Sequence, residues 1–194
     1  MQPVTKVESR TVVLAMSDID TDQIIPARFL TTTSRDGLGR HLFHDWRNRE
    51  DGSPRDDFIL NSPAAYGCQI LVAGRNFGCG SSREHAAWAL LDYGFRAIIS
   101  SAIADIFCSN ALKNGLLPIV VDNTVHAWLL ENPCAEVSID VRSSSLALPT
   151  GVTAEYPMDA FARYCLLEGL DQLGFLRKHD DAIRKFEENR PWTP

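Results

Sequence analysis

A short apolar strand, a glycine-rich turn and a helix follow one another between residues 68 and 94, and this stretch constrains the fold most strongly. The apolar run 70–73 is typical of a buried strand. Gly78 and Gly80 then let the backbone turn tightly, or approach a ligand closely, where a side chain would clash. Alanines and leucines continue as a helix that we expect to end at Gly94. The stretch therefore predicts a strand-turn-helix unit.

The turn and the expected start of the helix form a candidate anion site. Free backbone N–H groups at a helix N-terminus and the helix dipole both favour negative charge. Arg83, expected inside the first turn of the helix, adds a planar guanidinium fork that suits a carboxylate or a phosphate. Ser81 and Ser82 place hydroxyl groups beside that charge, which would ease the loss of a serine proton. The plainer interpretation stays open, because Ser81 and Glu84 also match the spacing of a capping box.

Two widespread phosphate-binding motifs do not fit this turn. The dinucleotide fingerprint G-x-G-x-x-G fails because Arg83 stands where the third glycine is required. A Walker A loop fails because no Gly-Lys-Ser or Gly-Lys-Thr occurs in the chain. The turn is therefore neither of these nucleotide-binding loops.

Size and composition describe an ordinary globular chain. Its 194 residues are enough for one domain with a proper core, and 45% of them are hydrophobic. The net charge of −6 argues against a nucleic-acid surface, which needs a basic patch. No apolar run approaches the roughly 20 residues of a membrane span. Residues 1–10 are polar and mixed in charge, unlike a signal peptide, so we expect a cytoplasmic protein.

The cysteines and histidines do not have the spacing of a known set of metal ligands. The five cysteines are odd in number and form no Cys-x-x-Cys, so neither a disulfide framework nor a cluster site is predicted. His41 and His44 are three residues apart, but no further zinc ligands lie close in the sequence. Cys79 lies in the turn, where a helix N-terminus and Arg83 are predicted to lower the pKa of its thiol. Local packing, or contact with a cofactor edge, explains Cys79 better than a catalytic thiol.

Two further segments stand out by composition. Asp18, Asp20 and Asp22 alternate, but the glycine and distal glutamate of a calcium loop are missing, so side-chain-to-backbone turns are the simpler interpretation. Residues 31–57 are polar and charged without a period, although Leu42, Phe43 and Trp46 share the spacing of one helical face. Long loops in compact domains are usually lids or solvated connections. Our hypothesis is a lid-like segment that is mobile in the free chain and orders with substrate and a partner.

Strands alternate with helices along most of the chain, which favours an α/β fold with a partly parallel sheet and flanking helices. No repeat or linker interrupts residues 1–194, so one domain is expected. The strands are expected at 11–16, 58–60, 70–73, 97–99, 117–121 and 137–141, with a hairpin at 146–148 and 152–154. The helices are expected at 103–114, 125–130, 158–170 and 179–189. Ile106, Phe161, Cys165, Leu166 and Leu170 are expected to face inward.

Two segments match known signatures. Residues 76–86, Asn-Phe-Gly-Cys-Gly-Ser-Ser-Arg-Glu-His-Ala, resemble the signature of the swivelling domain of the aconitase superfamily. Residues 20–26, Asp-Thr-Asp-Gln-Ile-Ile-Pro, resemble the second signature of that domain. Residues 41–47 and 110–118 are similar to the bacterial type of the isopropylmalate dehydratase small-subunit family. The resemblance runs over nearly the whole chain.

The resemblance implies a swivelling β/β/α-type domain and a hydro-lyase. Members of the family work in leucine biosynthesis and interconvert 2-isopropylmalate and 3-isopropylmalate by dehydration and rehydration. In the family a [4Fe-4S] cluster acts as Lewis acid. Because this chain lacks a cysteine triad spaced for it, we expect the cluster on a separate large subunit and no metal on this chain. A heterodimer or heterotetramer would follow, inactive without its partner.

The resemblance also assigns roles to residues of the two signatures. Ser81 is the expected base that removes the carbon-bound proton, and Arg83 is the expected carboxylate clamp. Ser82 and Gly80 are expected to contact the substrate. The expected supporting residues, which shape the site, are Asp20, Thr21, Asp22, Gln23, Cys79 and His85.

Two alternatives stay open at this point. A sister hydro-lyase, homoaconitase or a methylmalate dehydratase, also uses a separate small subunit with these signatures. Residues 25–30 are candidates for substrate choice, and Arg28 fits either an apolar substituent or a carboxylate. The other alternative is a regulatory module that binds an anion at the turn without catalysis.

Overall fold

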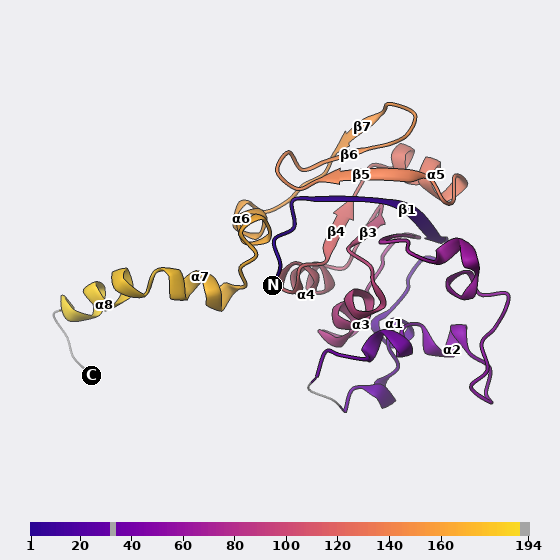
Figure 1. Ribbon diagram of the computed structural model, residues 1–194, viewed down its shortest axis with the longest axis horizontal. Helices are drawn as coiled ribbons and strands as arrows, with labels where there is room; N and C mark the ends of the chain where they lie inside the picture. Colours follow the sequence, from indigo (N-terminus) through magenta and orange to yellow (C-terminus); the bar gives the residue numbers. More distant parts are fainter. Residues whose placement is uncertain (32–33, 191–194) are drawn as a thin grey trace.

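The computed structural model describes residues 1–31 and 34–190. A seven-stranded sheet with the order β4-β3-β2-β1-β5-β6-β7 organises it (Figure 1). Its strands are β1 (Lys6–Leu14), β2 (Ile70–Ala73), β3 (Ala97–Ser100), β4 (Leu117–Val120), β5 (Glu136–Asp140), β6 (Ser145–Ala147) and β7 (Thr153–Glu155). Strands β1 to β4 are parallel, whereas β5, β6 and β7 pair antiparallel. The expected α/β fold with a partly parallel sheet is confirmed.

Strand β1 joins the parallel and antiparallel halves of the sheet. Its second half pairs in parallel with β2, from Thr11 opposite Ile70 to Leu14 opposite Ala73. Its first half pairs antiparallel with β5, from Lys6 opposite Asp140 to Arg10 opposite Glu136. The sequence predicted only the apolar second half, because one face of residues 6–10 is solvent-exposed and carries polar side chains.

Two hydrophobic clusters cover the opposite faces of the sheet. On one face Leu71, Ala73 and Ile98 pack with helices α3 (His85–Tyr93) and α4 (Asp105–Asn114) and with the 19–65 segment. On the other face, side chains that include Ile70 and Val72 pack with α5 (Asn123–Glu131), α6 (Ala160–Glu168) and the antiparallel strands. Because successive residues of β2 alternate between faces and both faces are covered, the strand reads as one continuous apolar run.

The described part of the 31–57 segment contains short helical elements. It forms η2 (Leu38–His41) and α2 (His44–Arg47), and it buries Leu42 and Phe43. Thr32 and Thr33 of this segment lie outside the described residues. The mobility of the segment stays a prediction, as does the single-domain organisation.

The strand expected at 58–60 is wrong, because this stretch is the turn of η3 (Ile59–Asn61), followed by η4 (Pro63–Ala65). The Asn61 side chain donates to the carbonyls of Arg47 (2.7 Å) and Arg55 (2.8 Å), which ties the stretch to its own loop. The short apolar run therefore packs against the core as a turn and pairs with no strand of the sheet.

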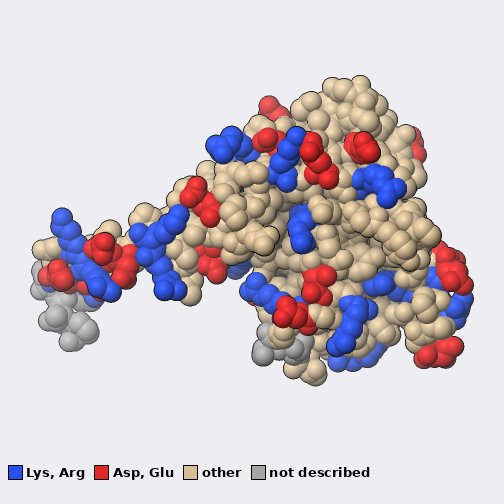
Figure 2. Space-filling model, viewed as in Figure 1, with Lys and Arg blue, Asp and Glu red and all other residues tan. Residues whose placement is uncertain are grey.

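Helices α7 (Gln172–Lys178) and α8 (Asp180–Glu188) extend away from the body as an arm (Figure 1). The α8 helix was expected and α7 was not. Positive and negative side chains are interspersed along the arm (Figure 2). Phe161 of α6 was expected inward but is 41% exposed, and its ring packs edge-on against Phe175 of α7 in the arm.

The burial of residues on α4 and α6 follows the expectations in part. Ile106 of α4 was also expected inward and is 54% exposed. Cys165 and Leu166 are buried as expected, and α6 ends before Leu170. Within the part of the chain that the structure describes, no helix has both the length and the apolar character needed to cross a bilayer.

Candidate active site

The glycine turn connects β2 to α3 at the carboxyl ends of the parallel strands, where open α/β sheets bind their ligands. Gly78 and Gly80 have φ values of +73° and +91°, which favour glycine. A Cβ atom on Gly78 would lie 2.4 Å from Cγ of the Phe107 ring. The close backbone approach at Gly78 is therefore to the core, whereas Gly80 is exposed and makes only ordinary contacts, so a close approach to a ligand stays a prediction.

The two signature segments lie directly against each other. Gly78 donates its N–H to the Ile19 carbonyl (2.7 Å), and Thr21 donates its N–H to the Cys79 carbonyl (2.9 Å). The Thr21 hydroxyl donates to the Ser81 carbonyl and accepts from the Ser81 N–H, both at 3.2 Å. The Thr21 hydroxyl therefore holds the backbone of Ser81 on both sides of its Cα atom. Thr21 itself is buried.

The capping box lies in the other signature segment. Asp20 accepts from the Gln23 N–H (2.8 Å), and the Gln23 side chain accepts from the Asp20 N–H (2.9 Å), at the start of α1 (Thr21–Ile24). The box expected between Ser81 and Glu84 is wrong, because α3 begins only at His85 and its N-cap, Glu84, makes no side-chain cap bond. Arg83 is consequently just before the helix, not inside it. Neither Ser81 nor Ser82 is the N-cap of α3, and both residues are exposed.

Arg83 points its guanidinium at the other signature. Its Nη1 atom forms an ion pair with Oδ1 of Asp22; the side chains are 22% and 53% exposed. The same Nη1 atom is buried and makes no hydrogen bond within the described residues. The half-exposed carboxylate of Asp22 is therefore the charge partner of this buried donor. The arrangement suits a ligand carboxylate that joins or displaces Asp22.

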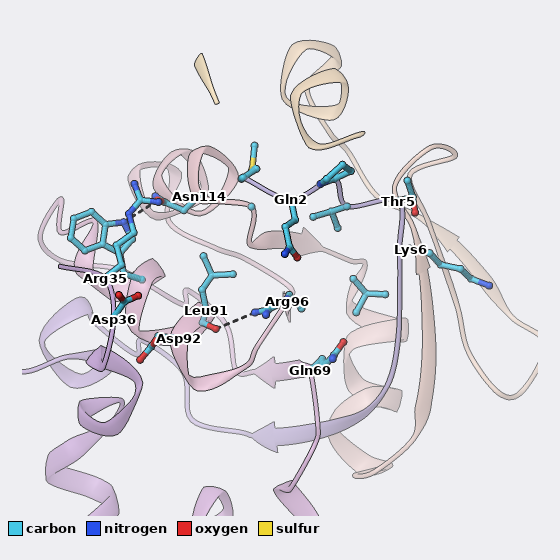
Figure 3. Close-up of a pocket in the computed structure, with 16 residues that line it drawn as sticks. Gln2, Thr5, Lys6, Arg35, Asp36, Gln69, Leu91, Asp92, Arg96 and Asn114 are labelled. Carbon is cyan, nitrogen blue, oxygen red and sulfur yellow. Dashed lines mark hydrogen bonds between the residues drawn. The ribbon is translucent and has the colours of Figure 1, made fainter. Parts of the chain in front are cut away.

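The turn forms an open surface. Gly80, Ser81 and Ser82 are exposed. The backbone N–H groups of Ser82 and Glu84 make no hydrogen bond within the described part of the chain. The cavity in Figure 3, about 450 Å³, lies elsewhere: it is lined by residues 1–7, by Trp88, Leu91 and Asp92 of α3, and by the end of α4. Donors and hydroxyls are thus gathered on a face that a second surface must cover to exclude water.

The thiol of Cys79 behaves opposite to the sequence prediction. Its pKa lies above the ordinary value, first because burial penalises the thiolate and then because the carboxylates of Asp20 and Asp18 oppose negative charge. Arg83 does not offset this, since it is engaged with Asp22. The predicted lowering of the pKa is therefore wrong, and Cys79 is a poor nucleophile at neutral pH.

The remaining predicted residues have local partners. The His85 ring lies 4.7 Å from the Trp88 ring, measured between centroids. Arg28 is paired with Asp45 and lies 3.1 Å from Nδ1 of His44. Within the described residues, no three metal-ligating side chains come together. Sequence reasoning missed the pairing of Asp22 with Arg83, although the alternating aspartates were a signal for it.

Comparison with known proteins agrees with this geometry. Residues 1–124 match the aconitase C-terminal domain family. Over 190 residues the chain is 61% identical to the 3-isopropylmalate dehydratase small subunit of Anaeromyxobacter dehalogenans (strain 2CP-C), covering 98% of this chain and 100% of that protein. It is 52% identical over 195 residues to the protein of the same name from Roseiflexus sp. (strain RS-1), covering 98% and 96%.

A solved structure matches as well. The crystal structure of 3-isopropylmalate dehydratase (leuD) from Methanocaldococcus jannaschii matches with a TM-score of 0.67 and 27% identity, over 93% of this chain and 98% of that chain. Fold and turn together define a protein of the aconitase C-terminal domain class. Within that class the chain belongs to the family of 3-isopropylmalate dehydratase small subunits. The resemblance is confirmed, and so is the enzyme class, because a dehydratase is a hydro-lyase.

Proposed function

We propose that this chain pairs with a large subunit and interconverts 2-isopropylmalate and 3-isopropylmalate by dehydration and rehydration, in leucine biosynthesis. The observation that carries the proposal is the 61% identity to a small subunit of that name over the whole of that relative. The designation "small subunit" implies a larger partner. The exposed turn supports this, because its hydroxyls and donors need a second surface to enclose a substrate. The cytoplasmic location stays a prediction.

Ser81 is proposed as the base. The proton to be removed is alpha to a carboxylate and weakly acidic, so charge that builds on this carboxylate needs fixed donors. Arg83 supplies a buried Nη1 donor, and the N–H groups of Ser82 and Glu84 face no acceptor in the described chain. The Ser81 Oγ, in its deprotonated alkoxide form, takes the proton and becomes the hydroxyl while Arg83 holds the carboxylate. We assign the [4Fe-4S] cluster expected from the resemblance, with its Lewis acid chemistry, to the large subunit.

The substituent that distinguishes the substrates is proposed to be isopropyl. A carboxylate substituent, as in the homoaconitase alternative, would need a free cation. Arg28, the candidate cation in the 25–30 segment, pairs with Asp45, so a carboxylate substituent would have to compete with Asp45 for it. An apolar substituent needs no such partner. Methyl-substituted malates stay the competing substrates, since a smaller apolar group meets the same surroundings.

Replacement of Ser81 tests the proposed base. In the complex reconstituted with a cluster-loaded large subunit, Ser81→Ala should lower turnover by at least about a hundredfold, because a positioned base contributes that much or more. The matched control is Ser109→Ala, an exposed serine on α4, which should leave turnover unchanged. Assembly, followed by size-exclusion chromatography, should be the same for all three proteins. Turnover of assembled Ser81→Ala complex near the wild-type value would remove the assignment.

A further inference from the structure

Asn114, a buried residue at the end of α4, forms hydrogen bonds through both the oxygen and the nitrogen of its side-chain amide, and one of its partners lies in the glycine turn segment. Asn114 is 7% exposed. Its Oδ1 accepts from the indole N–H of Trp88 (2.9 Å), and its Nδ2 donates to the Asn110 carbonyl (2.8 Å) and to Oε1 of Glu84 (2.7 Å). Because the Trp88 indole can only donate and the other two partners only accept, the orientation of the amide is determined. Aspartate, which has no donor when ionised, does not fit this position.

The groups that α4 binds belong to the segment immediately after Ser81. Glu84 is the last residue before α3, and Asn114 holds its carboxylate by a charge-assisted hydrogen bond. One helical turn earlier, Asn110 donates its Nδ2 to the Ser82 carbonyl (3.3 Å). The α4 helix therefore binds this segment at two points. On the other side, Thr21 holds the Ser81 backbone.

Few other bonds hold residues 82–84 in place. The Arg83 N–H donates to the Ser81 carbonyl (2.9 Å), and Arg83 pairs with the exposed Asp22. The Glu84 carbonyl accepts from Ala87 and Trp88 of α3. Without the two asparagines, the Ser82 carbonyl and the Glu84 carboxylate would have no side-chain donor among the described residues. The direction of Ser81 and Arg83 would then depend on a short, exposed stretch of backbone.

We infer that Asn110 and Asn114 are positioning residues that hold the Ser82–Glu84 segment, so that Ser81 and Arg83 meet the substrate in a fixed geometry. The catalytic part of this inference rests on the proposed function. The mechanical part does not, because the hydrogen bonds are those of this chain alone.

The kinetic test uses Asn114→Leu, which keeps the size of the side chain and removes all its hydrogen bonds. A misplacement of about 1 Å at a reacting group costs about a hundredfold. We expect kcat/KM per assembled complex to fall about tenfold to a hundredfold. If Asn114 acts through Glu84, the double variant Asn114→Leu/Glu84→Ala should fall no further than Glu84→Ala alone. Multiplied effects, or kcat/KM per assembled complex within twofold of wild type, would overturn the inference.

The matched control is Asn132→Leu. Asn132 closes α5 by donating to the Trp128 carbonyl (2.7 Å), on the opposite face of the sheet from α3 and α4. This variant loses a comparable helix-end hydrogen bond and should leave kcat/KM per complex unchanged. An equal loss in both variants would show a general effect of helix ends and would contradict the positioning role.

The second measurement is amide hydrogen exchange in the free chain at Arg83, Ala87 and Trp88, whose N–H groups donate to the Ser81 and Glu84 carbonyls. Exchange there should accelerate at least about tenfold in Asn114→Leu and remain at the wild-type rate in Asn132→Leu. If Asn114→Leu fails to fold, Asn110→Ala, on a partly exposed residue, carries both tests. Unchanged exchange would overturn the inference. If wild-type complex does not act on isopropylmalate, the proposed function fails while exchange still decides whether the asparagines hold the segment.

Discussion

Gly78→Ala should destabilise the protein by more than its backbone conformation alone explains. A residue with a Cβ loses about 1 to 2 kcal/mol in the left-handed conformation that Gly78 adopts at φ +73°. The new methyl group would also lie 2.4 Å from Cγ of Phe107. That ring is buried and packs edge-on against Phe77, so it has little room to move. Overpacking of this kind costs about 1 to 3 kcal/mol. Together the change should cost about 2 to 5 kcal/mol.

Gly52→Ala separates the two contributions. Gly52 has φ +81°, close to that of Gly78, but no atom lies within 4 Å of its ideal Cβ position. It should therefore lose only the conformational part. Urea unfolding of the free chain, followed by tryptophan fluorescence, gives both values. A mid-range loss of about 3 kcal/mol for Gly78→Ala corresponds to a Tm lower by about 6 to 12 °C. Equal losses in the two variants would refute the close contact between the turn and Phe107.

Two further predictions concern the charge and the thiol of the turn. Arg83→Lys should raise KM about tenfold to a hundredfold with a smaller change in kcat, because the bidentate charged hydrogen bond to the substrate carboxylate is lost. Unchanged steady-state kinetics would make Arg83 an ordinary surface residue. Iodoacetamide should alkylate Cys79 more slowly at pH 7.5 than a free cysteine, and faster as pH rises past the ordinary thiol range, because burial and two aspartates raise the pKa of its thiol. Rapid labelling at neutral pH, read by peptide mass spectrometry, would contradict this environment.

The sequence was most informative where one local pattern decided the structure. The apolar run of β2, the stop of α3 at Gly94 and the stop of α4 at Gly115 follow from periodicity and from glycines at helix ends. The first half of β1 was missed because its exposed face carries polar side chains. Ile106 and Phe161 were misplaced because helical spacing does not show which neighbouring element covers a face.

The site was harder to predict in detail than in outline. The two signatures predicted that residues 20–26 border the 76–86 turn, and Thr21 indeed contacts Ser81. The start of α3 was predicted too early, since Ser81 and Glu84 have capping-box spacing while the actual box is Asp20 and Gln23. The pKa of Cys79 was predicted in the wrong direction because burial and the position of Asp20 depend on tertiary structure. The roles of Ser81 and Arg83 stay predictions.

The most direct measurement is an activity assay with 2-isopropylmalate and 3-isopropylmalate, followed by the absorbance of the unsaturated intermediate. The chain is assayed alone, the cluster-loaded large subunit is assayed alone, and the two are assayed together. We expect turnover only in the mixture. Turnover of the mixture with homocitrate-type or methyl-substituted malates, and none with isopropylmalate, would contradict the proposed substrate. Turnover by the large subunit alone, merely altered by this chain, would contradict a catalytic half-site and favour a regulatory module.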